Sequence, residues 1–578
     1  MSWQAMSYPL GGGLNVADPA VAVLPGQALF VENFEAAREG GYRRIDGYSG
    51  YDGSASPLPA AVPGSGPIRG VMYLAGTLYA VRDNLAGTAA IIHKASAIGW
   101  QPVTMSPAMG FNNGISKVAV GVTVTGGTSG ATALVARVLV NGGDWSGTPG
   151  KAVGSLVLGN VTGTWQVGEA IKIGATACAN VTSLPVAPVL QAGGTYRTTN
   201  YNFGGAAGNV RIYGCDGINP AFEFDGVVFA QIRTGMPADR PYLIAAHRNY
   251  LFLGFAGGSV QYSGLGDPLT FLAKVGAGEL ALGDEVTNLV SYRGEVMVMT
   301  CRDRVALLYG SSPQDFAIKL ASQAAGATVQ SAREVSGQLY YLSGDGLTTL
   351  QATQDYGDFN SALLSRKVQP MLDASAARYA FVCREKGQLR LVMADGVIWS
   401  FTVMPDGTLA AMRGRYPQML NCADSWRDPA GREVIYGGFA DGKVCRLDSG
   451  SSFDGGGITA VLRLGFAIPQ VGRRFRLHRL VLQMLRGSPA SFIARMDFDL
   501  ARGTPSDYLM SALGAGGVYD QAQFDNVRYD GGFYAEVATN LTGVGESCDL
   551  IIVQQSAVSP SWGVAAINLF VTPRGFIR

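Results

Sequence analysis

The densest basic cluster in the sequence is a short stretch in which cationic and apolar side chains alternate. It reads Arg473-Arg474-Phe475-Arg476-Leu477-His478-Arg479. Alternate side chains of a β-strand share a face, so Arg474, Arg476 and His478 would lie side by side. Such a row of cations could contact passing nucleic-acid phosphates weakly and without reading sequence. We favour the simpler interpretation, a solvated face or ion pairs with the carboxylates of a neighbouring subunit.

The side chains that most often do covalent or metal chemistry are few and scattered. The histidines His93, His247 and His478 lie near no patterned serine, cysteine or acid that would form a catalytic triad or a metal site. No CxxC pair occurs, so the seven cysteines are expected to be free thiols in a reducing cytoplasm. They are Cys178, Cys215, Cys301, Cys383, Cys422, Cys445 and Cys548. Phosphate-cradling, dinucleotide-binding and nucleophile-elbow glycine motifs are absent too, so we predict no catalytic residues, cofactor or metal, and a protein that is not an enzyme.

One turn keeps a carbohydrate-directed alternative open. Ser343-Gly344-Asp345-Gly346 resembles part of the Asp-box of sialidases, although the glycine and the aromatic residue expected after it are missing. Enzymes that cleave glycans need paired carboxylates around a central pocket. The alternative to a structural protein is therefore one that binds or cleaves glycans, and it would need an aromatic-lined, carboxylate-bearing pocket.

The composition is poor in charge and rich in glycine. Charged residues make up 15% of the 578 residues and 79 residues are glycine, whereas ordinary soluble domains carry about 25% charged residues. Much of so uncharged a surface is expected to be covered by other subunits. Lys+Arg number 44 and Asp+Glu 43, a net charge of +1 that argues against a dedicated nucleic-acid binder. Finding neither a signal peptide nor a long apolar run, we expect a protein made in the cytoplasm, without a membrane-spanning segment.

The elements that carry these residues are expected to be β-strands. A unit made of a tight turn, a short strand, a second turn and another strand recurs along the chain. Its markers are Gly208, Arg248, Gly294, Gly337, Gly387 and Gly431, with a further copy at Gly76. The copies at Gly76, Gly208, Arg248 and Gly294 are the weaker ones. Consecutive markers from Gly208 on lie 40 to 50 residues apart, which is the length that a four-stranded propeller blade needs. We therefore predict an all-β fold with a β-propeller of six or seven blades over residues 61–110 and 185–454.

Three other regions depart from the blade period. Residues 111–184 are rich in Gly, Thr, Val and Ala and account for the excess length after Gly76, so we predict an inserted small β-module that folds on its own. Beyond Gly455 the strands alternate without the period, which predicts a C-terminal β-sandwich-like domain over residues 455–578. Helical periodicity is confined to a short candidate at 358–372.

The first 60 residues are expected to form an extended N-terminal arm. Its glycines permit close backbone packing, while Pro19 and Pro25 stiffen its path. Because it holds few alternating apolar residues, we expect it to serve assembly more than the core. The residues expected at assembly interfaces are Leu10, Gly11, Gly12, Gly13, Tyr42, Arg43, Arg44, Asp46, Arg474 and Arg476.

Residues 9–48 also carry a resemblance to a known family. The stretches concerned are Pro9-Leu10-Gly11-Gly12-Gly13-Leu14-Asn15, Asp18-Pro19, Leu24-Pro25-Gly26-Gln27-Ala28, Asn33-Phe34-Glu35 and Gly40-Gly41-Tyr42-Arg43-Arg44-Ile45-Asp46-Gly47-Tyr48. This segment resembles the opening of the tail nozzle proteins of short-tailed bacteriophages, the tail tubular protein B-like or DNA-stabilisation group. The blade-like units and the β-rich C-terminus fit the same family loosely over the rest of the chain.

The resemblance implies a structural virion protein of the phage tail. Such a protein forms a homo-oligomeric ring, usually of six subunits, below the portal and adaptor rings. Its lumen retains genomic DNA and later releases it, with only non-specific contact. The implied partners are further copies of the chain, the adaptor or head-to-tail connector protein, and tail fibres that the module at 111–184 could dock. Under the alternative interpretation, the chain is a virion-associated propeller that binds or cleaves glycans in receptor recognition.

Overall fold

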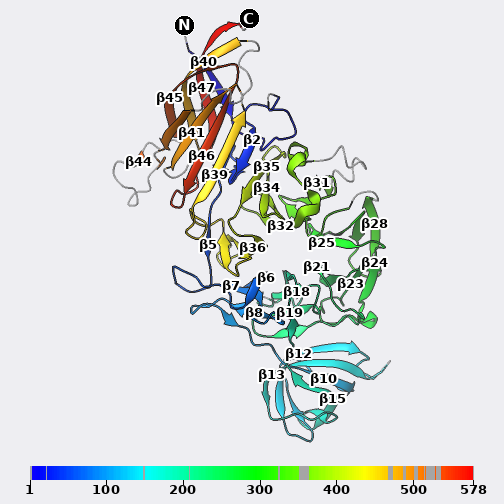
Figure 1. Cartoon of the computed structure of the whole chain (residues 1–578). Coiled ribbons are helices and arrows are strands. Elements are labelled where there is room, and N and C mark those ends of the chain that lie inside the picture. The colour runs from blue at the N-terminus through cyan, green and yellow to red at the C-terminus, as the bar shows by residue number, and fades with distance from the viewer. Residues whose placement is uncertain are drawn as a thin grey trace. The chain divides into compact units, whose positions relative to one another are not determined.

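In the computed structural model the chain folds almost entirely into antiparallel β-sheets and divides into two compact units (Figure 1). Unit 1 comprises Met1–Tyr51, Gln330–Gly437 and Cys445–Arg578, and unit 2 comprises Asp52–Val329 and Gly438–Val444. The structure describes residues 3–20, 22–147, 150–206, 208–322, 326–350, 364–465, 473–485, 490–499, 506–512, 514–515, 527–528 and 535–576. No helix within these ranges is long and apolar enough to cross a membrane.

Four small antiparallel sheets make up most of the described part of unit 2. The first consists of β6 (Ser65–Leu74), β7 (Thr77–Asp83), β8 (Ala89–Lys94), β9 (Gln101–Pro102) and β16 (Leu190–Gln191). The second consists of β17 (Arg197–Tyr201), β18 (Arg211–Cys215), β19 (Phe222–Phe224) and β20 (Phe229–Gln231). The third consists of β21 (Leu243–His247), β22 (Tyr250–Gly254), β23 (Ser259–Tyr262) and β24 (Gly278–Ala281), and the fourth of β25 (Val286–Tyr292), β26 (Val296–Cys301), β27 (Val305–Tyr309) and β28 (Ala317–Ser322). Nearly every strand pairs with its neighbour in sequence, as in a propeller blade.

Three more sheets of this kind lie wholly or mostly in the described residues of unit 1. They are β29 (Arg333–Val335), β30 (Gln338–Leu342) and β31 (Leu347–Thr349); β32 (Ala377–Cys383), β33 (Gln388–Met393), β34 (Val397–Val403) and β35 (Leu409–Arg415); and β36 (Leu420–Arg427), β37 (Glu433–Phe439), β38 (Val444–Leu447) and β5 (Tyr48–Gly50). The N-terminal strand β5 completes the last sheet, with Tyr48 opposite Leu447 and Gly50 opposite Cys445. The predicted all-β propeller fold is confirmed, and the described residues form seven blade-like sheets.

The residues that marked the blades in the sequence are turn residues with left-handed backbone. Gly294, Gly337 and Gly387 have φ angles of 69°, 77° and 59°. At the marker Arg248 the hairpin between β21 and β22 turns on Arg248 and Asn249, whose φ angles are 45° and 66°. Two-residue hairpins that match strand twist need positive φ at both central positions, and glycine and asparagine adopt it most readily. The repeat was visible in the sequence because this turn chemistry is strict.

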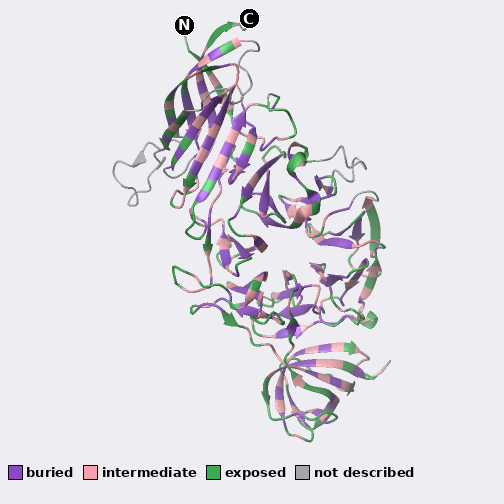
Figure 2. Ribbon diagram, viewed as in Figure 1, coloured by how far each residue is buried: buried purple, intermediate pink, exposed green. Residues whose placement is uncertain are grey.

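The chain between β9 and β16 forms a closed six-stranded barrel of order β10-β13-β12-β11-β14-β15. Its strands are β10 (Ala108–Gly114), β11 (Thr123–Gly126), β12 (Thr132–Gly142), β13 (Ala152–Thr162), β14 (Ala170–Ile173) and β15 (Thr176–Val186). Buried and half-buried residues alternate along most of β12 (Figure 2). The inward side chains, Phe111, Val135 and Leu156 among them, form a core of the barrel's own. The strands thus span 108–186, where the sequence suggested a module over 111–184.

Two larger sheets share one apolar core in unit 1. The first has the order β3 (Phe34–Ala36), β4 (Tyr42–Arg44), β47 (Gly563–Phe576), β40 (Arg473–Met484) and β45 (Ala535–Gly545), with β1 (Gln4–Pro9) also on β47. The second has the order β2 (Ala28–Glu32), β39 (Ile458–Gly465), β46 (Cys548–Ser556), β41 (Ala490–Phe498) and β42 (Ser506–Ala512). Phe492 of β41 stacks on Trp562, which precedes β47, with ring centroids 4.5 Å apart.

The remaining regular elements are short. In the described ranges they are the strands β43 (Gly514–Ala515) and β44 (Val527–Arg528), and the 3-10 helices η1 (Ala273–Val275), η3 (Arg366–Met371) and η4 (Ala374–Ala376). Of the helix expected at 358–372, the part at 358–363 lies outside the described residues, and η3 occupies most of the rest.

The expectation that residues 1–60 form an extended arm with little part in the core is wrong. The segment supplies strands β1 to β4 to the two large sheets, and β4 lies between β3 and β47. Leu10, Phe34 and Tyr42 belong to the common core and are almost fully buried. The segment was misjudged because its strands are only three to six residues long, which is too short for an alternating pattern to stand out.

Phe34 provides a test of this correction. Its ring packs edge-on against Trp562 at 5.7 Å, and its side chain is 1% exposed. We expect Phe34→Ala to lower the free energy of unfolding of unit 1 by about 3–5 kcal/mol, as in other buried aromatic truncations. Phe30→Ala is the matched control, because Phe30 on neighbouring β2 is 41% exposed and should cost far less. Urea unfolding of the full chain measures both, and equal small losses would restore the arm interpretation.

Candidate functional site

A buried ionic cluster joins the inserted barrel to the blade β17–β20. Arg137 of β12 donates from Nε to Glu223 of β19 at 2.6 Å and from Nη2 to Asp225 at 2.6 Å. Arg211 and the Tyr213 hydroxyl also reach Glu223, at 2.8 and 2.9 Å. Glu223 is 1% exposed. Such a buried carboxylate would be costly without these partners.

The electrostatics of the cluster agree with its geometry. Burial alone would lower the pKa of Arg137, but Glu223 and Asp225 raise it above its usual value. Burial would raise the pKa of Asp225, yet the backbone N–H groups of Val228 and Val227, together with Arg137, hold it below its usual value. Arg137 and Asp225 therefore both stay charged at neutral pH. The barrel residues Leu139 and Val157 also pack into the apolar core of the neighbouring blades.

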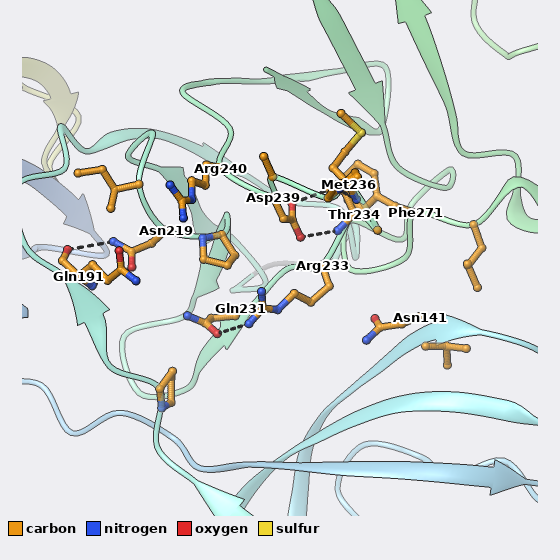
Figure 3. A pocket seen from close by; sticks show the side chains of 18 of the residues that line it. Asn141, Gln191, Asn219, Gln231, Arg233, Thr234, Met236, Asp239, Arg240 and Phe271 are labelled. Atoms are coloured by element: carbon orange, nitrogen blue, oxygen red, sulfur yellow. Dashed lines mark hydrogen bonds between the residues drawn. The ribbon is translucent and has the colours of Figure 1, made fainter. Parts of the chain in front are cut away.

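A cleft of about 850 Å³ opens beside this junction within unit 2 (Figure 3). The end of β12 forms one wall through Val140 and Asn141. The segment at 231–240, between β20 and β21, forms most of the opposite wall. Turns of the first blades and the chain at Phe271 complete it. The volume is in the range of sites that hold small ligands, roughly 300–1,000 Å³.

The 231–240 wall is held in one conformation by its own hydrogen bonds. Asp239 accepts from the Thr234 backbone N–H at 3.0 Å and from the Thr234 hydroxyl at 2.8 Å. Beyond the loop, the carbonyl of Pro241 accepts from the N–H of Gly217 at 3.0 Å. Because both oxygens of Asp239 are engaged within the loop, this carboxylate braces the wall and offers little charge to a ligand.

The side of the cleft near β16 is also prearranged. Asn219, which is 5% exposed, accepts from the Gln191 N–H at 2.8 Å and donates to the Gln191 carbonyl at 3.1 Å. Its amide also donates to Asp216 at 2.6 Å. The turn between β18 and β19 is thereby fixed to β16, the strand that returns from the barrel.

Two guanidinium groups at the cleft have no carboxylate partner. Arg233 donates to Gln231 at 3.3 Å, and in Figure 3 its guanidinium group lies beside the Gln231 amide. Among the described residues no carboxylate lies within 4.0 Å of Arg233 or Arg240. Asp239 is the one carboxylate among the described residues that line the cleft. The arrangement can bind anionic and hydroxylated groups, but it lacks the carboxylate pair with which glycosidases work.

The residues expected at assembly interfaces all belong to unit 1, whereas the residues that line the cleft belong to unit 2. Leu10 and Tyr42 are buried, and the Tyr42 hydroxyl lies 2.7 Å from the Gly11 carbonyl and 2.8 Å from the Gly26 carbonyl. Gly12 and Gly13 have φ angles of 80° and 73° in the same turn. These side chains and turns serve contacts within the chain.

Arg44 is also buried within the chain, although it was expected at an interface. Its guanidinium donates to the carbonyls of Ser559, Ser451 and Ser556 at 2.7 to 3.1 Å. Burial lowers the pKa of Arg44, and Asp46 opposes that shift. Arg44 therefore connects the N-terminal strands to two loops that follow far later in the sequence.

Arg43 and Asp46 take part in a second buried ionic cluster, which the sequence did not reveal. Lys386 lies 2.9 Å from Glu35, 2.9 Å from Asp46 and 3.3 Å from Asp448. The other members add Arg43–Glu35 at 2.8 Å and Arg390–Asp448 at 2.8 Å. Burial would raise the pKa values of Glu35 and Asp448, but the neighbouring Lys386 and Arg390 hold both below their usual values. The same carboxylates raise the pKa of Lys386 against its burial.

The basic strand lies in β40, as its alternation indicated. Arg474 is exposed, and its Nε lies 4.0 Å from Glu546 of the same chain. Arg476 is half-buried on the same strand. The ring of His478 stacks on Trp3 at 5.1 Å, and its Nε2 lies 2.9 Å from the Thr572 hydroxyl. Arg474 thus has a carboxylate near it within its own chain, and contact with a neighbouring subunit stays a prediction.

Comparisons with known proteins bear on the fold alone. No family model matches the chain, and no curated protein matches it. Among solved structures, a computationally designed protein, Ika8, aligns with a TM-score of 0.33 at 10% identity, over 67% of this chain and 98% of its own. Virginiamycin B lyase from Staphylococcus aureus aligns with 0.32 at 8%, over 58% and 97%. The WD40 repeats of RRP9 align with 0.32 at 10%, over 50% and 90%.

Arg137 is expected to control the attachment of the barrel. Arg137→Ala leaves Glu223 buried with fewer cationic partners, so we expect unit 2 to lose about 3–5 kcal/mol of unfolding free energy. Hydrogen exchange should rise in β12 and β19 together. Lys117→Ala is the control, since Lys117 is an exposed cation between β10 and β11 of the same barrel. Unchanged exchange in the Arg137 variant would show that the ion pairs do not hold the barrel.

The cluster around Glu35 predicts an acid-sensitive unit 1. The pKa values of Glu35 and Asp448 are lowered in the folded protein, so their stabilisation is complete above the unfolded-state values near pH 4 and is lost as the pH falls below them. We expect urea midpoints of unit 1 to fall steeply below about pH 4, and Asp448→Asn to flatten that decline while lowering stability at neutral pH. Glu536→Gln, at an exposed carboxylate of β45, should leave the profile unchanged. A parallel decline in the Asp448 variant would contradict this assignment.

Proposed function

We propose that the chain is a structural subunit of the tail nozzle of a short-tailed bacteriophage. Copies of it form a ring, usually of six, that meets the adaptor protein on one side and encloses a conduit for genomic DNA. The protein acts in the virion tail after synthesis in the bacterial host. Its role is to assemble into the ring and to let DNA pass through the lumen, and it catalyses no reaction.

The observation that carries this proposal is the structural role of the segment that resembles nozzle proteins. Three of its glycines could not be replaced without conflict. A Cβ added at Gly13, Gly26 or Gly41 would come within 2.7, 2.1 and 2.3 Å, respectively, of backbone atoms of Ala411, Pro9 and Val564, and all three glycines have positive φ. Only glycine fits such positions easily. The matching residues are thus ones that this fold requires, which supports a shared architecture over residues 9–48.

The scarcity of charged residues and the exposure of apolar side chains on an edge strand support an assembled state. Charged residues are scarce in the chain as a whole, and the outer strand β28 exposes Ile318 and Leu320 by 42% and 46%. Exposed apolar residues on an edge strand favour association with other chains. A ring of identical subunits covers two faces of each subunit and leaves no open end. In this arrangement the exposed Arg474 would face a neighbour more readily than the lumen.

The oligomeric state and its location test the proposal directly. Native mass spectrometry of the purified protein should give a closed assembly of about six copies, as expected for a cyclic homo-oligomer. Electron microscopy of the phage particle should place this density on the tail axis below the adaptor. A monomer or dimer located away from that axis would overturn the nozzle assignment.

The conduit role also predicts weak DNA binding. A lumen that held many phosphates tightly would obstruct DNA release, and the net charge of +1 fits a weak hold. We expect the assembly to bind a short duplex no more tightly than non-specific binders do, roughly 10⁻⁴–10⁻⁶ M at physiological salt. Fluorescence anisotropy over a salt series measures this. Tight binding with a steep salt dependence would remove the low-affinity lumen from the proposal while leaving the ring intact.

A further inference from the structure

The cleft between the barrel and the blades has a surplus of hydrogen-bond donors. Arg233 and Arg240 carry the guanidinium groups, and the exposed amide of Asn141 lines the cleft from the barrel side (Figure 3). Arg233 uses one donor on Gln231. Among the described lining residues the one carboxylate, Asp239, accepts hydrogen bonds from Thr234. A ligand that fits must therefore bring acceptors, and guanidinium groups pair best with carboxylate or phosphate oxygens.

The cleft also has a small apolar surface. Phe271 and Met236 pack with one side against the apolar core of the adjoining blades and line the cleft with the other. The sulfur of Met236 accepts from the Gln261 amide at 3.2 Å, which fixes the side chain. An aromatic face beside hydrogen-bonding amides and guanidinium groups suits a ligand with both C–H faces and hydroxyl edges, as sugar rings have.

The walls are braced by hydrogen bonds within the protein before any ligand arrives. Asp239 braces one wall, Asn219 fixes another, and the Arg137 cluster sets the distance of the barrel from the blade. Preorganised walls avoid the entropy cost of ordering side chains and loops on binding. The cleft would therefore hold an extended polar ligand without rearrangement of the protein.

A protein partner fits this cleft less well. Tight protein interfaces depend on large apolar or aromatic anchors that fill desolvated pockets, and here Phe271 is the one aromatic residue among the described lining residues. Peptides that add to a sheet edge need a continuous row of free backbone groups. This cleft is instead lined largely by loops and turns.

We propose that the cleft of unit 2 binds an acidic oligosaccharide, with Arg233 and Arg240 pairing with its sugar carboxylates and Phe271 packing against a ring face. This role goes beyond the nozzle function and does not depend on it, since every contact lies within one chain. It would let a tail subunit attach to carboxylate-bearing surface glycans. No bond is made or broken at the site.

Calorimetric titration of the full chain tests the proposal with defined probes. Tetragalacturonate and oligosialic acid supply carboxylates on two different sugar backbones, and maltotetraose is a neutral oligosaccharide of the same length and α-1,4 linkage as the first. We expect saturable binding of at least one acidic probe, about tenfold tighter than maltotetraose, because charge-assisted hydrogen bonds are the stronger ones. Arg233→Gln and Arg240→Gln should each weaken it by about tenfold, with melting temperatures unchanged.

The controls separate this site from general attraction to a cation. Arg293→Gln changes an exposed arginine at the β25–β26 turn of the same unit and should leave affinity unchanged. Hexaglutamate carries the same charge chemistry on a peptide and should bind at least about tenfold more weakly than the acidic sugar. The proposal is overturned if neither acidic probe binds at millimolar concentration, if the Arg233 and Arg240 variants bind normally, or if hexaglutamate binds equally well.

Discussion

The pairing of the first fifty residues with strands from the other end of the chain is the constraint on which unit 1 depends. β4 hydrogen-bonds to β47, and β5 completes the sheet of β36 to β38. The same N-terminal segment buries charged side chains in unit 1, since Glu35 and Arg44 are 0% exposed. A buried charge without partners would be strongly destabilising. The segment must therefore be in place for the two large sheets and the last blade to form together.

Both units use the same device to join segments that lie far apart in sequence. Each contains a buried ionic cluster in which opposite charges balance. In unit 1 the members are Glu35, Asp46 and Asp448 with Arg43, Lys386 and Arg390; in unit 2 they are Glu223 and Asp225 with Arg137 and Arg211. Such clusters add little net stability compared with apolar packing, but misplacing one member is costly. Each cluster therefore favours a single arrangement of the segments that it joins.

The inserted barrel gains a role from this attachment. Its own core is separate from the blades, and whether it folds alone stays a prediction. Once docked through Arg137, Leu139 and Val157, it supplies the second wall of the cleft. The cleft thus depends on the insertion as well as on the blades, because residues of both line it.

The sequence by itself determined the class of the fold and the position of the blades. Turns such as those at Gly294 and Gly337 need left-handed backbone, so their glycines recur wherever a hairpin does. Those are local rules, and the sequence displays them. Only the tertiary structure decided that the N-terminal segment is core, that Arg137 meets Glu223, and that Arg233 and Asn141 line one cleft. In each case a short or isolated signal depends on a partner distant along the chain, and no local pattern specifies which distant residue it will meet.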